Sequence, residues 1–389
     1  MKFERLGNII TIAKGKKPTF AESPNENSIR VLQIDDLRND NNIKYTDDKS
    51  GVFAKEDDVI LAWDGANAGT IGFGKTGFIG STLAVLRKSN SKDFDTVFIG
   101  KFLQTQFDFL RSKSTGATIP HINRISLESL KIPCLTLSDQ IQIANILSKA
   151  ETLIGQRKQS IALLDEFLKS TFLEMFGDPV KNKKVWEKDK IGSKCKVTKL
   201  AGYEYTKHVK YTEKGEIIVV KGLNVKNGRI KLDNISFIDR ATSDFLIRSK
   251  LFKGDVVMTY IGINIGDVAI VEIDNKFHLA PNVCKITPLN FKITNSYFLL
   301  YYLMYNRRLF VKGTTDTAKP SINMSEIREI EILLPPIELQ TQFATIVTKT
   351  EALKEQYKNS LQELENLYGS LSQKAFKGEL EFSKEVTAQ

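Results

Sequence analysis

The sequence repeats once, at a distance of about 200 residues, and this duplication restricts the folds that the chain can adopt. The segment DDVILAWDGANAG (57–69) aligns with GDVVMTYIGINIG (254–266), and aspartate, valine, asparagine and two glycines recur at a constant shift of 197. Further along, PHIN (120–123) aligns with PSIN (320–323) at a shift of 200. A register that persists over this span indicates a tandem duplication, whose period is far longer than that of solenoid repeats.

The first part of each copy is expected to be a globular domain rich in strands. Residues 1–135 and 181–335 are punctuated by Gly, Asn, Asp and Pro and contain runs such as EIIVVKGL, DVVMTY and DVAIVEI. Such runs are typical of strands joined by turns. The segments 97–110 and 296–310 are expected to be short helices attached to the sheets.

The second part of each copy, residues 136–180 and 336–380, is expected to be a long helix. Glycine and proline are almost absent inside both segments and reappear at their ends, and about 40 helical residues are about 60 Å long. Both helices carry an apolar stripe with heptad-like spacing. Such a stripe either packs a helix on its own domain or pairs it with another helix. Because both copies carry it, we expect an antiparallel pair that holds the domains apart and docks partner proteins through Leu147, Ile154, Ile161, Leu168, Met175, Leu353, Tyr357, Leu361, Leu364, Tyr368 and Leu371.

These expectations define the fold class as α+β. Two β-rich mixed α/β domains are separated by two long antiparallel helices resembling a coiled coil, and residues 381–389 form a tail. The three cysteines are single and far apart, so neither a disulfide framework nor a CxxC site is available. No apolar stretch approaches the roughly 20 residues of a spanning helix, and a cytoplasmic protein without membrane contact is expected.

The positive charge of the chain is concentrated in the globular regions. The chain has 56 Lys+Arg against 46 Asp+Glu, which gives a net charge of +10. Residues 1–135 contribute +3 and residues 181–335 contribute +11, whereas the helical regions sum to −3 and the tail adds −1. Backbone phosphates are a natural counterpart of basic domains, because neutralised phosphates release condensed counterions. Scattered lysines that only keep a domain soluble explain the +3 region nearly as well, but the clusters in the +11 region favour nucleic acid.

One catalytic motif matches by spacing alone. Residues 69–76, GTIGFGKT, fit the phosphate-binding pattern G-x-x-x-x-G-K-[ST], which requires a following helix. The next residues, GFIGSTLAV, favour strand, so a β-hairpin turn is the preferred explanation and a nucleotide-dependent enzyme the alternative. The three histidines are isolated, and no methyltransferase motif is present. We therefore expect no catalytic residue and no metal site in this chain.

The order of these segments resembles the specificity subunits of type I restriction–modification systems over essentially the whole chain. The resemblance rests on RVLQIDDLRND and EIIVVKGLNVKNG, on the duplicated segments 57–69 and 254–266, and on the loops STGATIPHIN and GTTDTAKPSIN. A proline-marked entry into a helix follows each loop. No single motif is highly specific, but their order occurs twice at a constant shift.

The resemblance implies that each globular region is a target recognition domain that reads half of a split sequence in double-stranded DNA. The paired helices would set the spacing and dock two methyltransferase subunits, and a restriction motor–nuclease subunit would join them. S-adenosylmethionine, ATP and Mg²⁺ would belong to those partners. Because LGNIITI begins almost at Met1, residues 374–380 are the expected partner that closes the repeat.

Candidate DNA contacts are chosen by residue type and position in turns. Arg, Lys, Asn and Gln read base edges in the major groove, while Lys, Thr and loop amides hold phosphates. The phosphate candidates are Lys14, Lys16, Lys17, Lys221, Lys312 and Lys319. The base-reading or positioning candidates are Gln33, Arg38, Asn67, Thr118, His121, Asn123, Asn224, Lys226, Asn264, Thr314, Thr315 and Asn323. For each of them the alternative is a turn or cap residue. A third hypothesis for the whole chain, a coiled-coil scaffold that binds proteins, predicts no DNA footprint.

Overall fold

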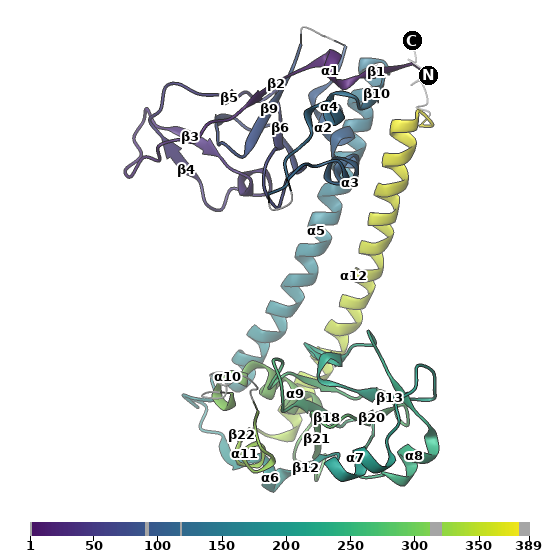
Figure 1. Cartoon of the computed structure of the whole chain (residues 1–389). Helices are drawn as coiled ribbons and strands as arrows, with labels where there is room; N and C mark the ends of the chain where they lie inside the picture. Colours follow the sequence, from purple (N-terminus) through teal and green to yellow (C-terminus); the bar gives the residue numbers. More distant parts are fainter. Residues whose placement is uncertain (1, 90–92, 117–118, 312–320, 381–389) are drawn as a thin grey trace, which may run out of the picture. The chain divides into compact units, whose positions relative to one another are not determined.

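The computed structural model describes residues 2–89, 93–116, 119–311 and 321–380 (Figure 1). The chain forms two compact units. Unit 1 combines the residues up to Lys158 with those from Asn359 onward, and unit 2 contains Gln159–Lys358. Each unit holds one β-rich domain, domain 1 or domain 2, together with a part of each long helix.

The two expected long helices are present. Helix α5 (Leu137–Phe176) has 40 residues and helix α12 (Ile337–Lys377) has 41. The Thr136 hydroxyl caps the start of α5, where it accepts a hydrogen bond from the Asp139 backbone N–H at 3.1 Å. Gly177 and Gly378 follow the two helices with φ of +79° and +73°, the left-handed conformation that ends a helix.

Domain 1 consists of two four-stranded sheets and a two-stranded ribbon. The strands are β1 (Phe3–Arg5), β2 (Ile10–Lys14), β3 (Ile29–Leu32), β4 (Lys44–Thr46), β5 (Phe53–Ala54), β6 (Val59–Ala62), β7 (Ile71–Phe73), β8 (Gly77–Ile79), β9 (Leu83–Lys88) and β10 (Lys131–Pro133). The helices are α1 (Leu6–Ile9), η1 (Asp35–Leu37), α2 (Thr96–Thr105), α3 (Phe107–Ser112) and α4 (Arg124–Glu128). The strand orders are β2-β9-β6-β7, β4-β3-β8-β5 and β1-β10, and among these described strands only β3 and β8 pair in parallel.

Domain 2 repeats this plan with additions. Its strands are β11 (Glu187–Lys190), β12 (Cys195–Lys199), β13 (Ile217–Val220), β14 (Val225–Lys226), β15 (Gly228–Ile230), β16 (Phe237–Ile238), β17 (Lys250–Leu251), β18 (Val256–Thr259), β19 (Val268–Ile270), β20 (Phe277–Leu279), β21 (Val283–Pro288) and β22 (Glu331–Leu334). Its helices are α6 (Ile191–Lys194), α7 (Gly202–His208), η2 (Gly222–Asn224), α8 (Arg240–Phe245), α9 (Ser296–Tyr305), α10 (Arg307–Phe310) and α11 (Met324–Glu329). The sheets are β12-β21-β18-β19-β15-β14, β16-β13-β20-β17 and β11-β22.

The strand registers confirm the duplication. Val59 lies opposite Phe73 in the β6–β7 pair, and Val256 lies opposite Ile270 in the β18–β19 pair. Both pairs are therefore related by the shift of 197 found in the sequence. The hairpin of β14 and β15 extends the sheet of domain 2 beyond β19 and has no counterpart among the described strands of domain 1.

Repeated polar residues hold the same contacts in both copies. The buried carboxylates of Asp58 and Asp255 accept a hydrogen bond from the backbone N–H three residues earlier, at 2.8 and 2.9 Å. Asp58 also forms a two-pronged ion pair with Arg87, whereas Asp255 lies 3.5 Å from the Lys285 ammonium. These contacts close the turn before β6 and β18, which explains why aspartate recurs there.

The cores of the two units include residues from both long helices. In unit 1, Ile143 of α5 and Ala375 of α12 join the core that is formed by β2, β6, β9 and α2. The Phe376 ring lies 5.3 Å from Phe98, which confirms that the segment 374–380 closes the repeat on domain 1. In unit 2, Phe172 of α5 contacts Phe343 of α12 with ring centroids 5.4 Å apart.

Within each unit the helices run antiparallel. In unit 1 the Tyr368 hydroxyl donates to Glu151 at 2.6 Å and the Lys158 ammonium lies 2.8 Å from Glu365. In unit 2 Lys354 pairs with Asp165. Along these contacts the residue numbers of α5 rise as those of α12 fall. The expected α+β class with an antiparallel helix pair is therefore confirmed.

The outer and the middle residues of the apolar stripe differ in their surroundings. Its outer residues pack on the domains, with Leu147, Tyr368 and Leu371 in or against the core of unit 1 and Leu168 and Met175 in or against that of unit 2. Its middle residues, Ile154, Ile161, Tyr357, Leu361 and Leu364, are half-buried. Leu353 departs from the expected pattern because it is exposed, while its neighbours Glu351 and Lys354 turn to ion pairs with Arg229 and Asp165.

The phosphate-loop alternative is wrong for residues 69–76. The segment runs through β7 and leads into β8, a strand of the other sheet, so it lacks the helix that a phosphate loop requires. The expected hairpin turn is also wrong for this segment, because the hairpin joins β6 to β7 and closes at Gly69. The Lys75 ammonium pairs with Asp40 at 2.8 Å.

Candidate nucleic-acid interface

Three segments of domain 1 meet around the carboxylate of Asp64, which follows β6. The Lys14 ammonium lies 2.7 Å from one carboxylate oxygen and His121 Nδ1 lies 2.6 Å from the other. Backbone bonds from Ile122 to Trp63 and from Gly65 to Pro120, both 2.9 Å, fix this arrangement. Burial alone raises the pKa of the Asp64 carboxyl, but the hydrogen bonds from His121 and Lys14 outweigh it and hold the pKa below its ordinary value. Asp64 therefore carries a negative charge that orients the exposed Lys14 ammonium and the exposed His121 ring.

The adjoining turn between β6 and β7 presents further polar groups. Gly65 and Gly69 have φ of +97° and +98°, a conformation that favours glycine. Between them, Asn67 accepts a hydrogen bond from the Arg38 guanidinium at 2.9 Å, and Arg111 donates to the Ala66 carbonyl. The structure therefore brings together four of the sequence candidates, Lys14, Arg38, Asn67 and His121.

Domain 2 has a hollow at the equivalent place. This hollow of about 470 Å³ is lined by Tyr205, Tyr211, Lys221, Gly222, Leu223, Thr259, Ile261, Gly262, Ile263, Asn264, Ala280, Pro281 and Asn282. The Lys221 ammonium lies 5.1 Å from the centre of the Tyr211 ring and donates to the Ser236 hydroxyl at 2.6 Å. Ile263 is 91% exposed at the tip of the β18–β19 turn. Lys221 and Asn264 are the sequence candidates that line this hollow.

The equivalent turns differ in chemistry at matched positions. Ile261 stands where domain 1 has Asp64, at the shift of 197, and Ile263 stands where domain 1 has Ala66. Lys199, at the end of β12, corresponds to Lys14 at the end of β2, but its ammonium lies over the Tyr260 ring, 5.8 Å from the centroid. Domain 1 therefore offers an ion-paired polar cluster where domain 2 offers an apolar surface.

Other sequence candidates have structural contacts or lie apart from these turns. Asn224 is buried and donates to the carbonyls of Lys231 and Asp233 at 3.0 and 2.8 Å, so it holds its loop and is removed from the surface. Asn123 and Asn323 cap α4 and α11 through hydrogen bonds at 2.9 Å. All three asparagines therefore act as turn or cap residues, which was the alternative stated for each candidate.

The remaining candidates divide into exposed side chains and positions outside the described residues. Lys16, Lys17 and Lys226 are exposed, and Gln33 is half-buried beside η1. The positions outside the described residues are Thr118, Lys312, Thr314, Thr315 and Lys319.

Sequence reasoning missed residues of the two turns and of the lining of the hollow. Asp64, Tyr205, Tyr211 and Ile263 were not among the candidates, because a carboxylate repels phosphate and apolar residues suggest a core. A comparison of the two copies gives the signal, since Asp64 aligns with Ile261 and Ala66 aligns with Ile263 in an otherwise matching segment.

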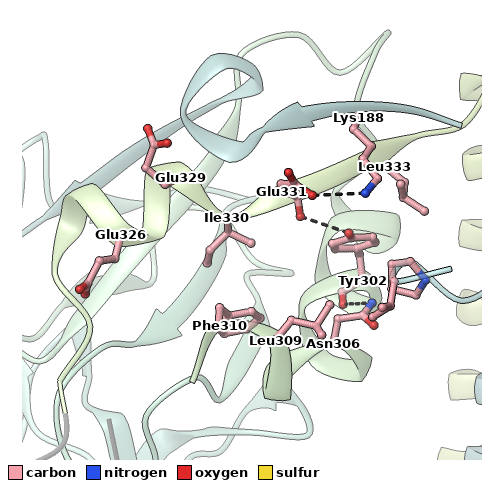
Figure 2. Close-up of a pocket in the computed structure, with 12 residues that line it drawn as sticks. Lys188, Tyr302, Asn306, Leu309, Phe310, Glu326, Glu329, Ile330, Glu331 and Leu333 are labelled. Carbon is pink, nitrogen blue, oxygen red and sulfur yellow. Dashed lines mark hydrogen bonds and ion pairs between the residues drawn. The ribbon is translucent and has the colours of Figure 1, made fainter. Parts of the chain in front are cut away.

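A second cavity in unit 2, of about 600 Å³, lies between α9–α10 and α11–β22 (Figure 2). Figure 2 shows that Glu331 is joined to Lys188 and to Tyr302, and that Tyr302 is also joined to Asn306. The Tyr302 hydroxyl donates to the Glu331 carbonyl at 3.1 Å, and the Lys188 ammonium lies 3.4 Å from the Glu331 carboxylate. Leu309, Phe310, Ile330 and Leu333 supply apolar walls. The cavity therefore combines apolar walls with the charged groups of Lys188, Glu326, Glu329 and Glu331.

The described part of the chain, residues 2–89, 93–116, 119–311 and 321–380, also bears on membranes and metals. Within it, none of the helices is long and apolar enough to cross a bilayer. The same residues contain no group of three or more His, Cys, Asp or Glu side chains placed to bind a metal ion.

Comparisons with known proteins agree with the duplicated architecture. A family model described as the type I restriction modification DNA specificity domain matches residues 1–164 and again residues 183–366. The specificity subunit of the type I restriction enzyme MjaVIII from Methanocaldococcus jannaschii is 29% identical over 377 residues, which cover 93% of this chain and 88% of that subunit. The EcoBI specificity subunit from Escherichia coli is 22% identical over 390 residues, with coverages of 91% and 81%.

A solved structure shows a related fold. This structure is the S subunit of a type I restriction–modification system from M. genitalium, with a TM-score of 0.63 and 17% sequence identity. The alignment covers 98% of this chain and 96% of that S subunit. At this identity the similarity concerns the fold. Its coverage shows that both domains and both helices take part in the match.

Proposed function

This chain belongs to the family of DNA specificity subunits of type I restriction–modification systems, and from this premise we propose that its two domains read the two halves of an asymmetric bipartite DNA target. The observation that carries the proposal is the pair of equivalent turns. They are built on the same hairpin register but present different side chains. Two domains that share one fold but differ in their binding surfaces suit two half-sites of different sequence.

Recognition would combine base reading with phosphate binding. The turns between β6 and β7 and between β18 and β19 present the base-reading groups, and exposed lysines such as Lys16, Lys17 and Lys226 hold phosphates. Two readers on one face of the duplex would place the half-sites about one helical turn, roughly 34–36 Å, apart. The base pairs between the half-sites would be spanned without being read.

The partner subunits complete the proposal. We assign to α5 and α12 the tasks of setting the spacing and docking two methyltransferase subunits, which a restriction motor–nuclease subunit joins. The chain itself would be non-catalytic and act in the cytoplasm, while S-adenosylmethionine, ATP and Mg²⁺ would bind to the partners. The strand geometry of residues 69–76 supports the placement of ATP on another subunit.

The experiment that tests the proposal varies the spacer of a bound target. A split target is selected with the full-length chain from random duplexes, and its spacer is then lengthened or shortened by one or two base pairs. Because each base pair rotates one half-site by about a tenth of a turn, we expect affinity to fall about tenfold or more, the loss of several specific contacts. Binding is measured by fluorescence anisotropy, with an unrelated duplex as the reference for non-specific binding.

Two results would contradict the proposal. Affinity that is independent of spacer length would exclude two coupled readers. The absence of any footprint on DNA would favour the protein-binding scaffold.

A further inference from the structure

The equivalent turns of the two domains indicate which bases each domain prefers. This inference rests on the proposed function. In domain 1 the turn residue between Gly65 and Asn67 is alanine, and in domain 2 the matching residue is Ile263. Ile263 is 91% exposed and adjoins the hollow, so that it extends the hollow into one contiguous apolar surface of the kind that a ligand covers. The exposed side chain therefore points to an apolar feature of the bound DNA.

The surroundings of Ile263 are also apolar. Leu223 is 44% exposed beside it, and Ile261, Ala280 and Pro281 line the same hollow. The rings of Tyr205 and Tyr211 lie 5.7 Å apart in its wall. The Lys221 ammonium adds one positive charge to this lining and is held by Ser236 and the Tyr211 ring. Positive charge beside an apolar surface fits a base edge between phosphates.

Thymine is the base with a matching apolar group. In the major groove, thymine presents a 5-methyl group, whereas the other bases present hydrogen-bonding groups only. Aliphatic side chains contact this methyl group and gain the hydrophobic free energy of its burial, about 0.8 kcal/mol, or about fourfold in affinity. A hollow of about 470 Å³ is roomy enough for more than one such contact.

Domain 1 offers the opposite chemistry. Lys14 and His121 are both held by the Asp64 carboxylate, and the Arg38 guanidinium is held by Asn67. Guanine presents two acceptors, N7 and O6, on its major-groove edge, and cationic donors are its usual partners. Asp64 acts here as a positioning residue, because it fixes its two partners without itself presenting a donor.

We propose that domain 2 recognises thymine through its 5-methyl group, with Ile263 and the adjoining hollow as the contact, and that domain 1 recognises guanine through the Lys14 ammonium, which Asp64 positions. The two half-sites then differ in the chemistry by which they are read. This difference arises at aligned positions of the two copies, where Asp64 and Ala66 correspond to Ile261 and Ile263.

The test removes single atoms from the selected target of the full-length chain. Uracil replaces thymine, which removes only the methyl group, and 7-deazaguanine replaces guanine, which removes only the N7 acceptor. The substitutions are made in one half-site at a time and measured with the original chain, with Ile263→Ala and with Asp64→Asn. Each variant thereby reports which half-site its domain reads.

Uracil in one half-site is expected to weaken binding about fourfold per contacted methyl group. Ile263→Ala is expected to bind the thymine target more weakly and to show a smaller uracil effect there, because the contact between Ile263 and the methyl group is already lost. 7-Deazaguanine in the other half-site is expected to weaken binding about tenfold, and Asp64→Asn to reduce that effect. Ile273→Ala is the matched control, an exposed isoleucine of domain 2 outside the hollow, and it should behave as the original chain.

Several outcomes would overturn the inference while leaving the proposed function intact. One is a split target with no thymine in the half-site that Ile263→Ala affects. Another is an undiminished uracil effect in Ile263→Ala, or an undiminished deazaguanine effect in Asp64→Asn. If no split target can be selected at all, the proposed function fails and the inference fails with it.

Discussion

His278 in β20 is a single-residue difference between the two copies that bears on stability. It replaces Phe78 of domain 1, the residue at the same position of the parallel β3–β8 pair. Its ring is fully buried, Nδ1 lies 3.1 Å from the Ser243 hydroxyl, and Nε2 has no hydrogen-bond partner among the described residues. Burial first, and then the charges of Lys285 and Lys250, lower the pKa of His278 to about 4. A neutral imidazole is therefore built into domain 2.

This pKa predicts a loss of stability in mild acid. The unfolded chain takes up the histidine proton near pH 6.5 and the folded chain only near pH 4, so the contribution is complete above pH 6.5 and is lost as the pH falls to 4. The difference corresponds to about 3 kcal/mol. His278→Phe, which restores the residue of domain 1, should remove this part of the acid sensitivity. The measurement is urea unfolding at pH 7 and pH 4.5, followed by Trp186 in a Trp63→Phe background.

The comparison of the two proteins isolates the histidine, because carboxylates titrate equally in both. Ser243→Ala is combined with His278→Phe so that no buried hydroxyl loses its partner. An equal loss of free energy in acid with and without the histidine would contradict the prediction.

At the scale of elements, the sequence predicts the long helices well and the partners of their side chains poorly. Forty residues almost without Gly or Pro admit few other structures, so α5 and α12 were expected with nearly their observed length. Spacing alone does not distinguish a seam between helices from a contact with a domain, so helix pairing was expected for Leu147 and Leu168, although packing on the domain was the stated alternative and is what they do. The same limit applies to the site. Asn224 turns inward and Lys14 outward, although both residue types suit DNA.

The docking of each long helix onto its own domain depends on a repeated glutamine. Gln340 is fully buried, and its side chain accepts from the Asn295 N–H at 2.8 Å and donates to the carbonyls of Ile293 and Pro335 at 3.0 and 2.8 Å. Gln140 makes the corresponding three bonds in unit 1. One side chain thus satisfies three backbone groups where a helix, a loop and a strand end meet.

Gln340→Leu is expected to destabilise unit 2 strongly. The substitution leaves one buried donor and two buried acceptors without a partner, at about 1–3 kcal/mol for each unsatisfied group, so a total loss of about 2–4 kcal/mol is expected after partial relaxation. Gln342→Leu is the matched control, since that glutamine also recurs in both copies but is exposed. Its effect should stay within about 0.5 kcal/mol. Urea unfolding midpoints measure both, and similar losses in the two variants would show that the buried bonds are unimportant.

At the scale of the whole molecule, charge is divided between elements that bind and elements that connect. The globular regions carry +3 and +11, whereas the helical regions sum to −3. Several charges of the helices are engaged in structural pairs within the units, such as Lys158 with Glu365 and Lys354 with Asp165. Exposed lysines of the domains are therefore expected to carry the electrostatic part of DNA binding.

This division predicts how binding depends on salt. Each lysine that neutralises a phosphate of duplex DNA contributes about 0.9 to the slope of log affinity against log salt concentration. The double variant Lys16→Ala/Lys17→Ala should therefore lower the slope by about 1.8, with equal weakening on the selected target and on unrelated duplexes, because phosphate contacts carry no sequence information. The control is Lys149→Ala/Lys349→Ala, which removes the same charge from exposed positions of α5 and α12 and should leave the slope unchanged. Anisotropy titrations between 50 and 200 mM salt, as in the usual working range, separate the two cases. An equal fall in slope for the helix variant would mean that the long helices also lie against the phosphates, and the division of charge would then have no functional meaning.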